Sequence, residues 1–470
     1  LVHDFITDAF AWNDLGAALS LSRGEGELST YRARRTQAGG FAQVRLRWRE
    51  RLAGGFLMRR GGDSYLGANA KWAWYPGGHL SWRFWNAAPK RFAALSLSYG
   101  ESGGAPLHPA TARGRMAPFG AAYAGGEWVP IWWQVQGANP LLEAERRQEW
   151  NLRLSWSLGT RLSGAFTLFR ARADRLIQEG ELVRGLLELP RWENSGRLNN
   201  AGWSFALDWH TLNGGLQWRQ ALAISAQSVR LERWNAAGLP ELRGTLGGPG
   251  TGGRVLRFAD DRPFAEFFLP VLLSVSPDGQ VIHKDVNGDG FFCHCEDDAE
   301  PLGTGWPTLQ LGWEHTLRWK GWSLRTLLRG VFGHRQMSVL RAVYEQPRLS
   351  FQNQVRTAKF LPQTDDFLPI SSHYVEKASF LRLEFLQLGY AFGQGPERPA
   401  PRWSLTLTAH NLFSLSGYSG LDPEPRLADP GAALNGSFPP EEKDPLLLGL
   451  DRRNTYAKTR GWALGVVVEW

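Results

Sequence analysis

The segment that most limits the fold is the last one, residues 460–470, where large apolar residues alternate with smaller or charged ones. Every second position is large and apolar, namely Trp462, Leu464, Val466, Val468 and Trp470. A period of two indicates an extended strand with two different faces. Chain ends usually fray, so a final strand that ends on an aromatic ring favours a membrane β-barrel, where such rings lie at the lipid–water boundary.

The same alternation recurs along the whole chain. In one segment Val44, Leu46 and Trp48 alternate with three arginines. We count about 14 such segments, each near the ~9–11 residues that cross a bilayer at a tilt. They begin near Asp14, Phe41, Gly54, His79, Phe92, Gln148, Arg161, Ala201, Gly215, Thr308, Gly321, Ser379, Trp403 and Thr459. One of them loses its alternation past Phe385. The pattern predicts an all-β fold, an antiparallel transmembrane β-barrel of about 14 strands.

The connections between these segments alternate between short and long. Short ones fall at residues 52–53, 86–90, 159–160, 213–214, 320–321 and 393–401. Long ones cover residues 101–147, 173–200, 228–305, 334–378 and 414–458. Outer-membrane barrels have short periplasmic turns and long extracellular loops. The alternation therefore predicts extracellular long loops, with both chain ends on the periplasmic side.

Composition narrows the alternatives. The chain has 2 cysteines and no apolar run of 18 residues, which argues against a disulfide framework and against helical membrane spans. Its 23 tryptophans suit an aromatic interface. The net charge of +8 is mostly arginine, without a nucleic-acid motif, and suggests a polar lumen or a lipopolysaccharide-facing rim. The alternative, a soluble β-sandwich, predicts that Trp150, Trp156, Trp203 and Trp313 are buried in a core.

Several short motifs follow one another in order along the chain. They lie at residues 59–64 with 71–76, 95–100, 139–151, 194–202, 285–290, 374–390, 411–424 and 451–470. Two of the most specific read YVEKASFLRL, from Tyr374, and YSGLDPE, from Tyr418. Together the motifs resemble the SusC/RagA family of TonB-dependent outer-membrane receptors. The resemblance covers the whole chain but only the C-terminal part of that family's architecture.

This resemblance implies that residues 1–470 are part of a barrel of about 22 strands. The plug and the segment that contacts TonB are not visible, so we expect a fragment or one piece of a split receptor. It also implies TonB-dependent uptake of oligosaccharides or peptides in the outer membrane of a Gram-negative cell. The implied partners are a SusD-like lipoprotein, outer-membrane lipids and, through a missing N-terminal part, the TonB complex.

Two alternatives to this function stay open at the level of the sequence. One is a self-closed, passive porin-like pore, in which the strand near Asp14 pairs with the strand near Trp462. The other is a non-transport role, as an outer-membrane scaffold or adhesin with a filled lumen. No Ser/His/Asp arrangement, paired carboxylate or phosphate loop stands out, so we do not expect an enzyme.

Residues 285–296 have the spacing of a calcium-binding loop. Asp285, Asn287, Asp289 and Glu296 supply hard oxygen ligands at alternate or terminal positions, and Gly290 permits the sharp turn. The alternative is an Asn/Asp/Gly turn that needs no ion. We therefore expect no required cofactor, with Ca²⁺ as a possible ligand of this loop.

Cys293, His294 and Cys295 lie inside the same loop. Three adjacent residues of an extended chain cannot all face one metal ion, and a zinc site needs wider spacing and a fourth ligand. The favoured interpretation is an incidental exposed pair of cysteines, with a strained disulfide second.

The long connection at residues 101–147 is rich in aromatic side chains. Tyr123, Trp128, Trp132 and Trp133 are candidates for stacking on sugar rings or peptide side chains. Tryptophan is abundant throughout the chain, so a membrane girdle or loop packing is the favoured explanation.

Overall fold

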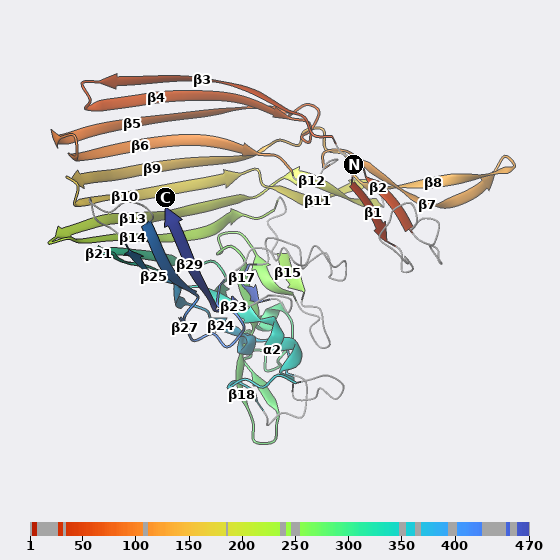
Figure 1. Cartoon of the computed structure of the whole chain (residues 1–470). Helices are drawn as coiled ribbons and strands as arrows, with labels where there is room; N and C mark the ends of the chain where they lie inside the picture. The colour runs from red at the N-terminus through yellow and green to blue at the C-terminus, as the bar shows by residue number, and fades with distance from the viewer. Residues whose placement is uncertain are drawn as a thin grey trace.

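The computed structural model describes residues 2–6, 27–31, 34–106, 111–184, 187–235, 241–245, 254–346, 354–361, 368–392, 402–424, 448–451 and 458–469. Its central element is one 14-stranded antiparallel sheet (Figure 1). In spatial order its strands are β29 (Gly461–Glu469), β26 (Arg402–His410), β25 (Phe380–Phe392), β22 (Trp322–Phe332), β21 (Leu309–Trp319), β14 (Leu216–Arg233), β13 (Arg197–Asn213), β10 (Leu162–Asp174), β9 (Glu145–Leu158), β6 (Arg91–Gly104), β5 (Trp72–Ala88), β4 (Leu52–Asp63) and β3 (Gln37–Trp48). The short β27 (Ser414–Ser416) pairs with β25 beside this row.

The sheet confirms the antiparallel all-β prediction. Each long strand of the row matches one of the segments expected from alternation, while the segment near Asp14 lies outside the described residues. The strand that loses its alternation past Phe385 is continuous, as β25. Its register with β22 shifts between Leu327 and Leu328, opposite Phe385 and Leu383. An extra residue at such a bulge inverts the in–out pattern, which explains the broken alternation.

The register places apolar and polar residues on opposite faces of the sheet. Leu154 of β9 lies between Leu95 of β6 and Phe166 of β10, so large apolar side chains from neighbouring strands share one face. We call this apolar face the outward face. Trp150 is 52% exposed and Trp313 is 37% exposed on it. The soluble-sandwich alternative, which required buried tryptophans, is therefore wrong for these side chains. The other face, called the polar face, carries residues such as Arg153 and Ser155.

The short turns lie at one end of the sheet and the long connections leave from the other (Figure 1). Between β13 and β14 the turn is formed by Gly214 and Gly215, both with positive φ. Two consecutive positive φ angles give a turn whose twist matches that of the paired strands. The end with the long connections is called the long-connection end.

The long connections fold into elements of their own. These are the pairs β7 (Arg115–Ala124) and β8 (Glu127–Gln136), β11 (Ile177–Arg184) and β12 (Leu187–Asn194), and β18 (Leu272–Val275) and β19 (Val281–His283). A further pair, β1 (Val2–Ile6) and β2 (Glu27–Tyr31), precedes the large sheet in the chain. A four-stranded sheet contains β15 (Glu241–Thr245), β16 (Arg254–Phe258), β17 (Glu266–Pro270) and β20 (Ala299–Thr304). A three-stranded sheet contains β24 (Val375–Lys377), β23 (Arg335–Ser338) and β28 (Leu450–Asp451). The helical turns are η1 (Glu296–Asp298), α2 (Val339–Tyr344) and η2 (Ser372–Tyr374).

The described residues within 241–304, 335–377 and 448–451 form a packed body that we call the cap. Its core contains Phe258, Phe267 and Met337, all fully buried. Val229 and Leu231, on the polar face of β14, join the same core. The cap therefore lies on the polar side of the curved sheet, at the long-connection end, as Figure 1 shows.

The sheet is open within the described residues. There β29 pairs only with β26, and β3 pairs only with β4. In the described part of the chain, no helix is both long and apolar enough to span a membrane.

Candidate functional site beneath the cap

The polar face of the sheet is a charged, hydrogen-bonding wall. Arg219 Nε donates to Asp208 Oδ2 at 2.9 Å, and Arg325 Nε donates to Glu314 Oε1 at 2.7 Å, each pair joining neighbouring strands. Exposed ion pairs of this kind add only about 0–1 kcal/mol to stability. They mark this face as a hydrated, charged surface.

The cap above this wall is held together by a buried arginine. Arg341, on α2, is fully buried, and its Nη1 donates to Glu376 Oε1 at 2.6 Å. Its Nε donates to Glu345, one helical turn later. Arg341 Nη2 also lies 2.9 Å from His373 Nε2. Burial and the adjacent guanidinium lower the pKa of His373 to about 4, so the neutral ring can accept this hydrogen bond.

A second ion network joins two of the sequence motifs. Arg382 donates to Asp422 Oδ1 at 2.6 Å and to Glu424 Oε2 at 2.9 Å. Arg329 Nη1 donates to Glu424 Oε1 at 2.6 Å. Burial alone would raise the pKa of Glu424, but Lys458 and Arg329 hold it at about 2. The charged side chains of the motifs at residues 374–390 and 418–424 therefore bind each other and hold the two segments together.

The carboxylates of the 285–296 loop hydrogen-bond to its own backbone. Asp285 accepts from the N–H groups of Gly288 at 2.7 Å and Gly290 at 2.9 Å. Asp289 accepts from Phe291 N–H at 2.8 Å, while Glu296 begins η1. Among the described residues, no group of three or more His, Cys, Asp or Glu side chains is placed to hold a metal ion. The loop is thus closed by Asx-type turns, and calcium binding stays a prediction.

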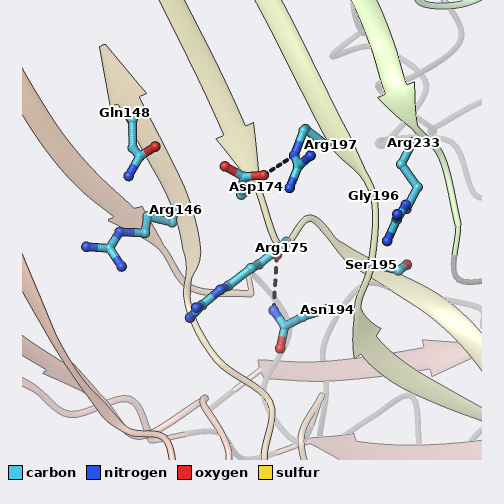
Figure 2. A pocket seen from close by; sticks show the side chains of 9 residues that line it. All are labelled: Arg146, Gln148, Asp174, Arg175, Asn194, Ser195, Gly196, Arg197 and Arg233. Carbon is cyan, nitrogen blue, oxygen red and sulfur yellow. Dashed lines mark hydrogen bonds and ion pairs between the residues drawn. The ribbon is translucent and has the colours of Figure 1, made fainter. Parts of the chain in front are cut away.

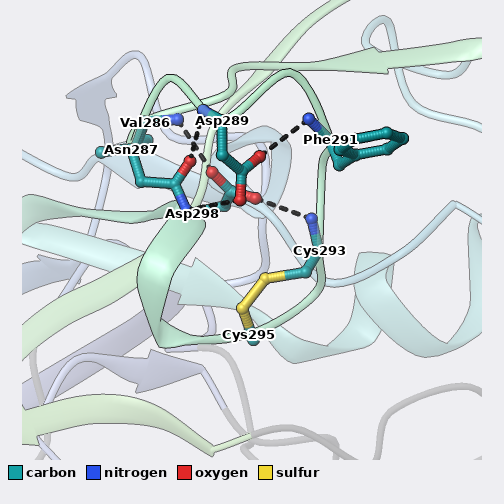
Figure 3. The surroundings of a disulfide bond; sticks show 7 residues. All are labelled: Val286, Asn287, Asp289, Phe291, Cys293, Cys295 and Asp298. Atoms are coloured by element: carbon teal, nitrogen blue, oxygen red, sulfur yellow. Dashed lines mark hydrogen bonds between the residues drawn. A yellow bond between two sulfur atoms is a disulfide. The ribbon is translucent and has the colours of Figure 1, made fainter.

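Cys293 and Cys295 form a disulfide, so the interpretation as an incidental exposed pair is wrong (Figure 3). Their Cα atoms lie 5.2 Å apart, within the range that a disulfide bridges. The turn is held in place by Asp298, which accepts from Cys293 N–H at 2.7 Å and from Val286 N–H at 2.8 Å. In an extended strand residues i and i+2 already share a side but lie about 7 Å apart, so alternation alone does not predict the shorter separation that this turn gives.

Acidification is expected to loosen the end of this loop between pH 6.5 and about 4. His283 stacks on Phe292, with ring centroids 4.3 Å apart, and burial together with His294 lowers its pKa to about 4. The unfolded segment binds the proton at the ordinary histidine value near 6.5, so opening becomes more favourable as pH falls through this window. Hydrogen exchange of residues 281–295 at pH 7.5 and pH 4.5 measures the change. The His283→Phe variant is the control and should lose most of the pH dependence.

The four candidate aromatic residues lie on the β7–β8 hairpin, which extends away from the sheet at the long-connection end (Figure 1). Tyr123 is paired with Trp128 across the hairpin, with ring centroids 5.6 Å apart. Both rings are exposed, as are Trp132 and Trp133. Tyr123 and Trp128 therefore form one aromatic surface, while the hairpin pairs with no strand of the large sheet within the described residues.

A pocket that the sequence did not indicate lies at the long-connection end of β9, β10 and β13. Its volume is about 410 Å³ (Figure 2). Side chains of four arginines line it together with polar residues, namely Arg146, Gln148, Asp174, Arg175, Asn194, Ser195, Gly196, Arg197 and Arg233. Arg146 and Gln148 have the same in–out parity as Leu154 on β9. The pocket therefore opens on the outward face, away from the polar wall.

Comparison with known proteins decides the family. The family model for the TonB dependent receptor-like β-barrel matches residues 3–270, more than half of the chain. The chain belongs to this family. This match confirms the prediction of a TonB-dependent receptor barrel.

The relatives extend beyond the region covered by this chain. TonB-dependent receptor P26 of Formosa agariphila is 22% identical over an aligned length of 430, and the alignment covers 82% of this chain and 42% of that protein. TonB-dependent receptor P3 of the same organism is 21% identical over an aligned length of 464, and the alignment covers 89% of this chain and 45% of that protein. The chain thus spans less than half the length of both curated relatives.

Solved structures show the same fold. The RagAB peptide transporter aligns with 95% of this chain and 48% of its own chain, with a TM-score of 0.75 and 17% identity. The RagAB peptide importer in its 'open-open' state gives a TM-score of 0.76, covering 96% and 49%.

Proposed function

We propose that the chain forms the C-terminal-side strands of the barrel in an outer-membrane, TonB-dependent importer of oligosaccharides or peptides. The observation that carries the proposal is the sheet with one apolar and one charged face, capped at one end on its charged side. In a barrel, the apolar face of such a sheet contacts the lipid bilayer and the charged face lines an aqueous interior. The family supports the TonB-dependent assignment, and RagAB, whose structures share this fold, is a peptide transporter.

The proposal includes an orientation and partners. The long-connection end faces the cell exterior, and both ends of the chain face the periplasm. A SusD-like lipoprotein covers the cap, and the TonB complex acts through a part of the receptor outside this chain. The exposed aromatic surface of Tyr123 and Trp128 supplies a stacking contact to substrate or partner.

Uptake measurements in the source bacterium test the proposal. We expect that deletion of the coding sequence abolishes uptake of labelled peptide or oligosaccharide pools, and that a protonophore abolishes it in the parent strain. Comparison of the two pools identifies the substrate class. Uptake that is insensitive to the protonophore would indicate the passive pore instead, and normal uptake in the deletion strain would favour the non-transport scaffold.

Calcium is proposed as an optional ligand of the 285–296 loop, not a required cofactor. We expect Tb³⁺, a luminescent Ca²⁺ substitute, to bind the purified protein and to be displaced by Ca²⁺. Asp285→Asn and Asp289→Asn remove negative charge from the loop and should weaken the signal about tenfold or more. Equal signals from the parent and from both variants would leave the loop as an ion-free turn.

A further inference from the structure

The outward face changes from apolar to arginine-rich over three rows near the long-connection end. The first row above the apolar band pairs Tyr99, Trp150 and Arg170. One step further along the strands, the second row carries Gln148, Arg172, Asn199 and Arg230, and the third carries Arg146, Asp174, Arg197 and Arg233. These residues share the parity of the outward leucines on their own strands, except Arg233, which follows a register shift in β14 and lies opposite Arg197. Their position on the outward face therefore follows from the register.

The arginines in these rows outnumber the acids that neutralise them. Asp174 accepts from Arg172 Nε at 2.8 Å and from Arg197, while Arg197 Nη1 also donates to Glu232 at 2.7 Å. Arg146 Nε donates to Glu101 at 2.7 Å. The remaining three arginines are exposed and form no ion pair within the described part of the chain, namely Arg170, Arg230 and Arg233. The patch therefore keeps a net positive charge.

The depth of the patch follows from the aromatic pair beneath it. Tyr99 and Trp150 pack with ring centroids 4.5 Å apart, at the upper edge of the apolar band. Tyrosine and tryptophan mark the boundary between hydrocarbon and headgroups. The next rows along the strands, about 7 Å apart, thus fall at headgroup level. The pocket of about 410 Å³ beside Arg146, Arg197 and Arg233 opens at the same level (Figure 2).

We propose that this outward patch binds the phosphorylated headgroup of a glycolipid of the outer leaflet. Guanidinium groups match phosphate oxygens in a bidentate geometry, and the apolar band directly below provides a surface for the acyl chains. A transported solute does not explain the patch, because the rows face away from the polar wall. The inference depends on the proposed outer-membrane location and on the exterior position of the long-connection end.

The test removes the three arginines that have no ion pair, so that no carboxylate loses its partner. The variant is Arg170→Ala, Arg230→Ala and Arg233→Ala, in the complete protein purified from outer membranes. Its control is Arg45→Ala, Arg47→Ala and Arg153→Ala, which removes the same charge from the opposite face. The probes are diphosphorylated lipid A, dephosphorylated lipid A and phosphatidylglycerol, titrated as fluorescent lipids against the protein in detergent micelles.

We expect about a tenfold or greater loss of affinity for diphosphorylated lipid A in the outward variant, with the control unchanged. Dephosphorylated lipid A should bind weakly to all three proteins. Equal binding by the parent and the outward variant would overturn the proposal. Equally tight binding of phosphatidylglycerol would also overturn it, since that result means general attraction of anionic lipid. Cell fractionation and uptake are measured in parallel, so failure of the proposed location or transport is seen separately from failure of lipid binding.

Discussion

Replacing Leu154 by Arg is expected to destabilise the membrane-inserted sheet by about 2–4 kcal/mol, because it places a charge against the lipid near the middle of the apolar band. Leu154 lies in the row of Leu95 and Phe166, with the aromatic boundary pair two rows away. An arginine at this depth has no acidic partner in its row. The same magnitude lowers the folding equilibrium constant by about thirtyfold or more.

The adjacent residue provides the control. Ser155 points to the polar face, where a space of about 650 Å³ is bounded by small residues such as Ala165 and Ala206. Ser155→Arg therefore adds the same charge one position away and should be tolerated. Equilibrium urea unfolding of each variant in lipid vesicles gives the free energies. If both substitutions cost the same, the assignment of the two faces is wrong.

The large sheet could be predicted from the sequence because each strand carries its own signal. In a membrane-spanning sheet one face meets lipid and the other meets water, so a period of two is visible in every strand, as in Val44, Leu46 and Trp48. The exception, β25, fails only where the bulge opposite Leu327 and Leu328 inverts the pattern. Local periodicity therefore predicts where the strands lie, but it does not predict a bulge in the pairing of two strands.

The cap could not be predicted in the same way. Its strands are short, and β16 and β17 are largely buried, so no alternation marks them. Nothing in the local sequence distinguishes Arg341 from the other arginines. It is buried because α2 packs against the segment that carries Glu376. The arginine pocket also depends on long-range register, which brings Arg146, Arg197 and Arg233 together from three strands. Compositional reasoning indicated an arginine-rich rim but not which residues build it.

The motifs that resemble the family have a structural explanation. Asn139 donates to the backbone carbonyl of Trp192 at 2.8 Å, and Asn194 accepts from Glu143 N–H at 2.7 Å. Arg382 and Asp422 likewise join two other motifs. These side chains hold the connections at the long-connection end in place. The motifs therefore identify the architecture and do not by themselves indicate a substrate.

The second large effect is expected in the cap. Arg341→Met should cost about 3–5 kcal/mol of cap stability, because Glu345 then remains buried without a cationic partner and buried Glu376 keeps only Lys359. Hydrogen exchange of the α2 segment, Val339–Tyr344, reports the loss. Arg356→Met is the matched control and should change exchange little, because this cap arginine is exposed, donates to Gln354 at 2.9 Å and lies over the Phe360 ring, without a buried carboxylate as partner.

A compensated variant separates the loss of charge balance from the loss of packing. Adding Glu345→Gln and Glu376→Gln to Arg341→Met removes the buried charges together, and we expect it to recover most of the lost stability. Buried ion pairs replaced as a unit are often close to neutral, whereas breaking one partner is costly. If the triple variant is no more stable than Arg341→Met, the arginine acts through its packing on Tyr374 and its hydrogen bonds to His373. Recovery would mean that the ion network adds little net stability to the cap. Its main effect would then be to select one arrangement of the cap on the polar face.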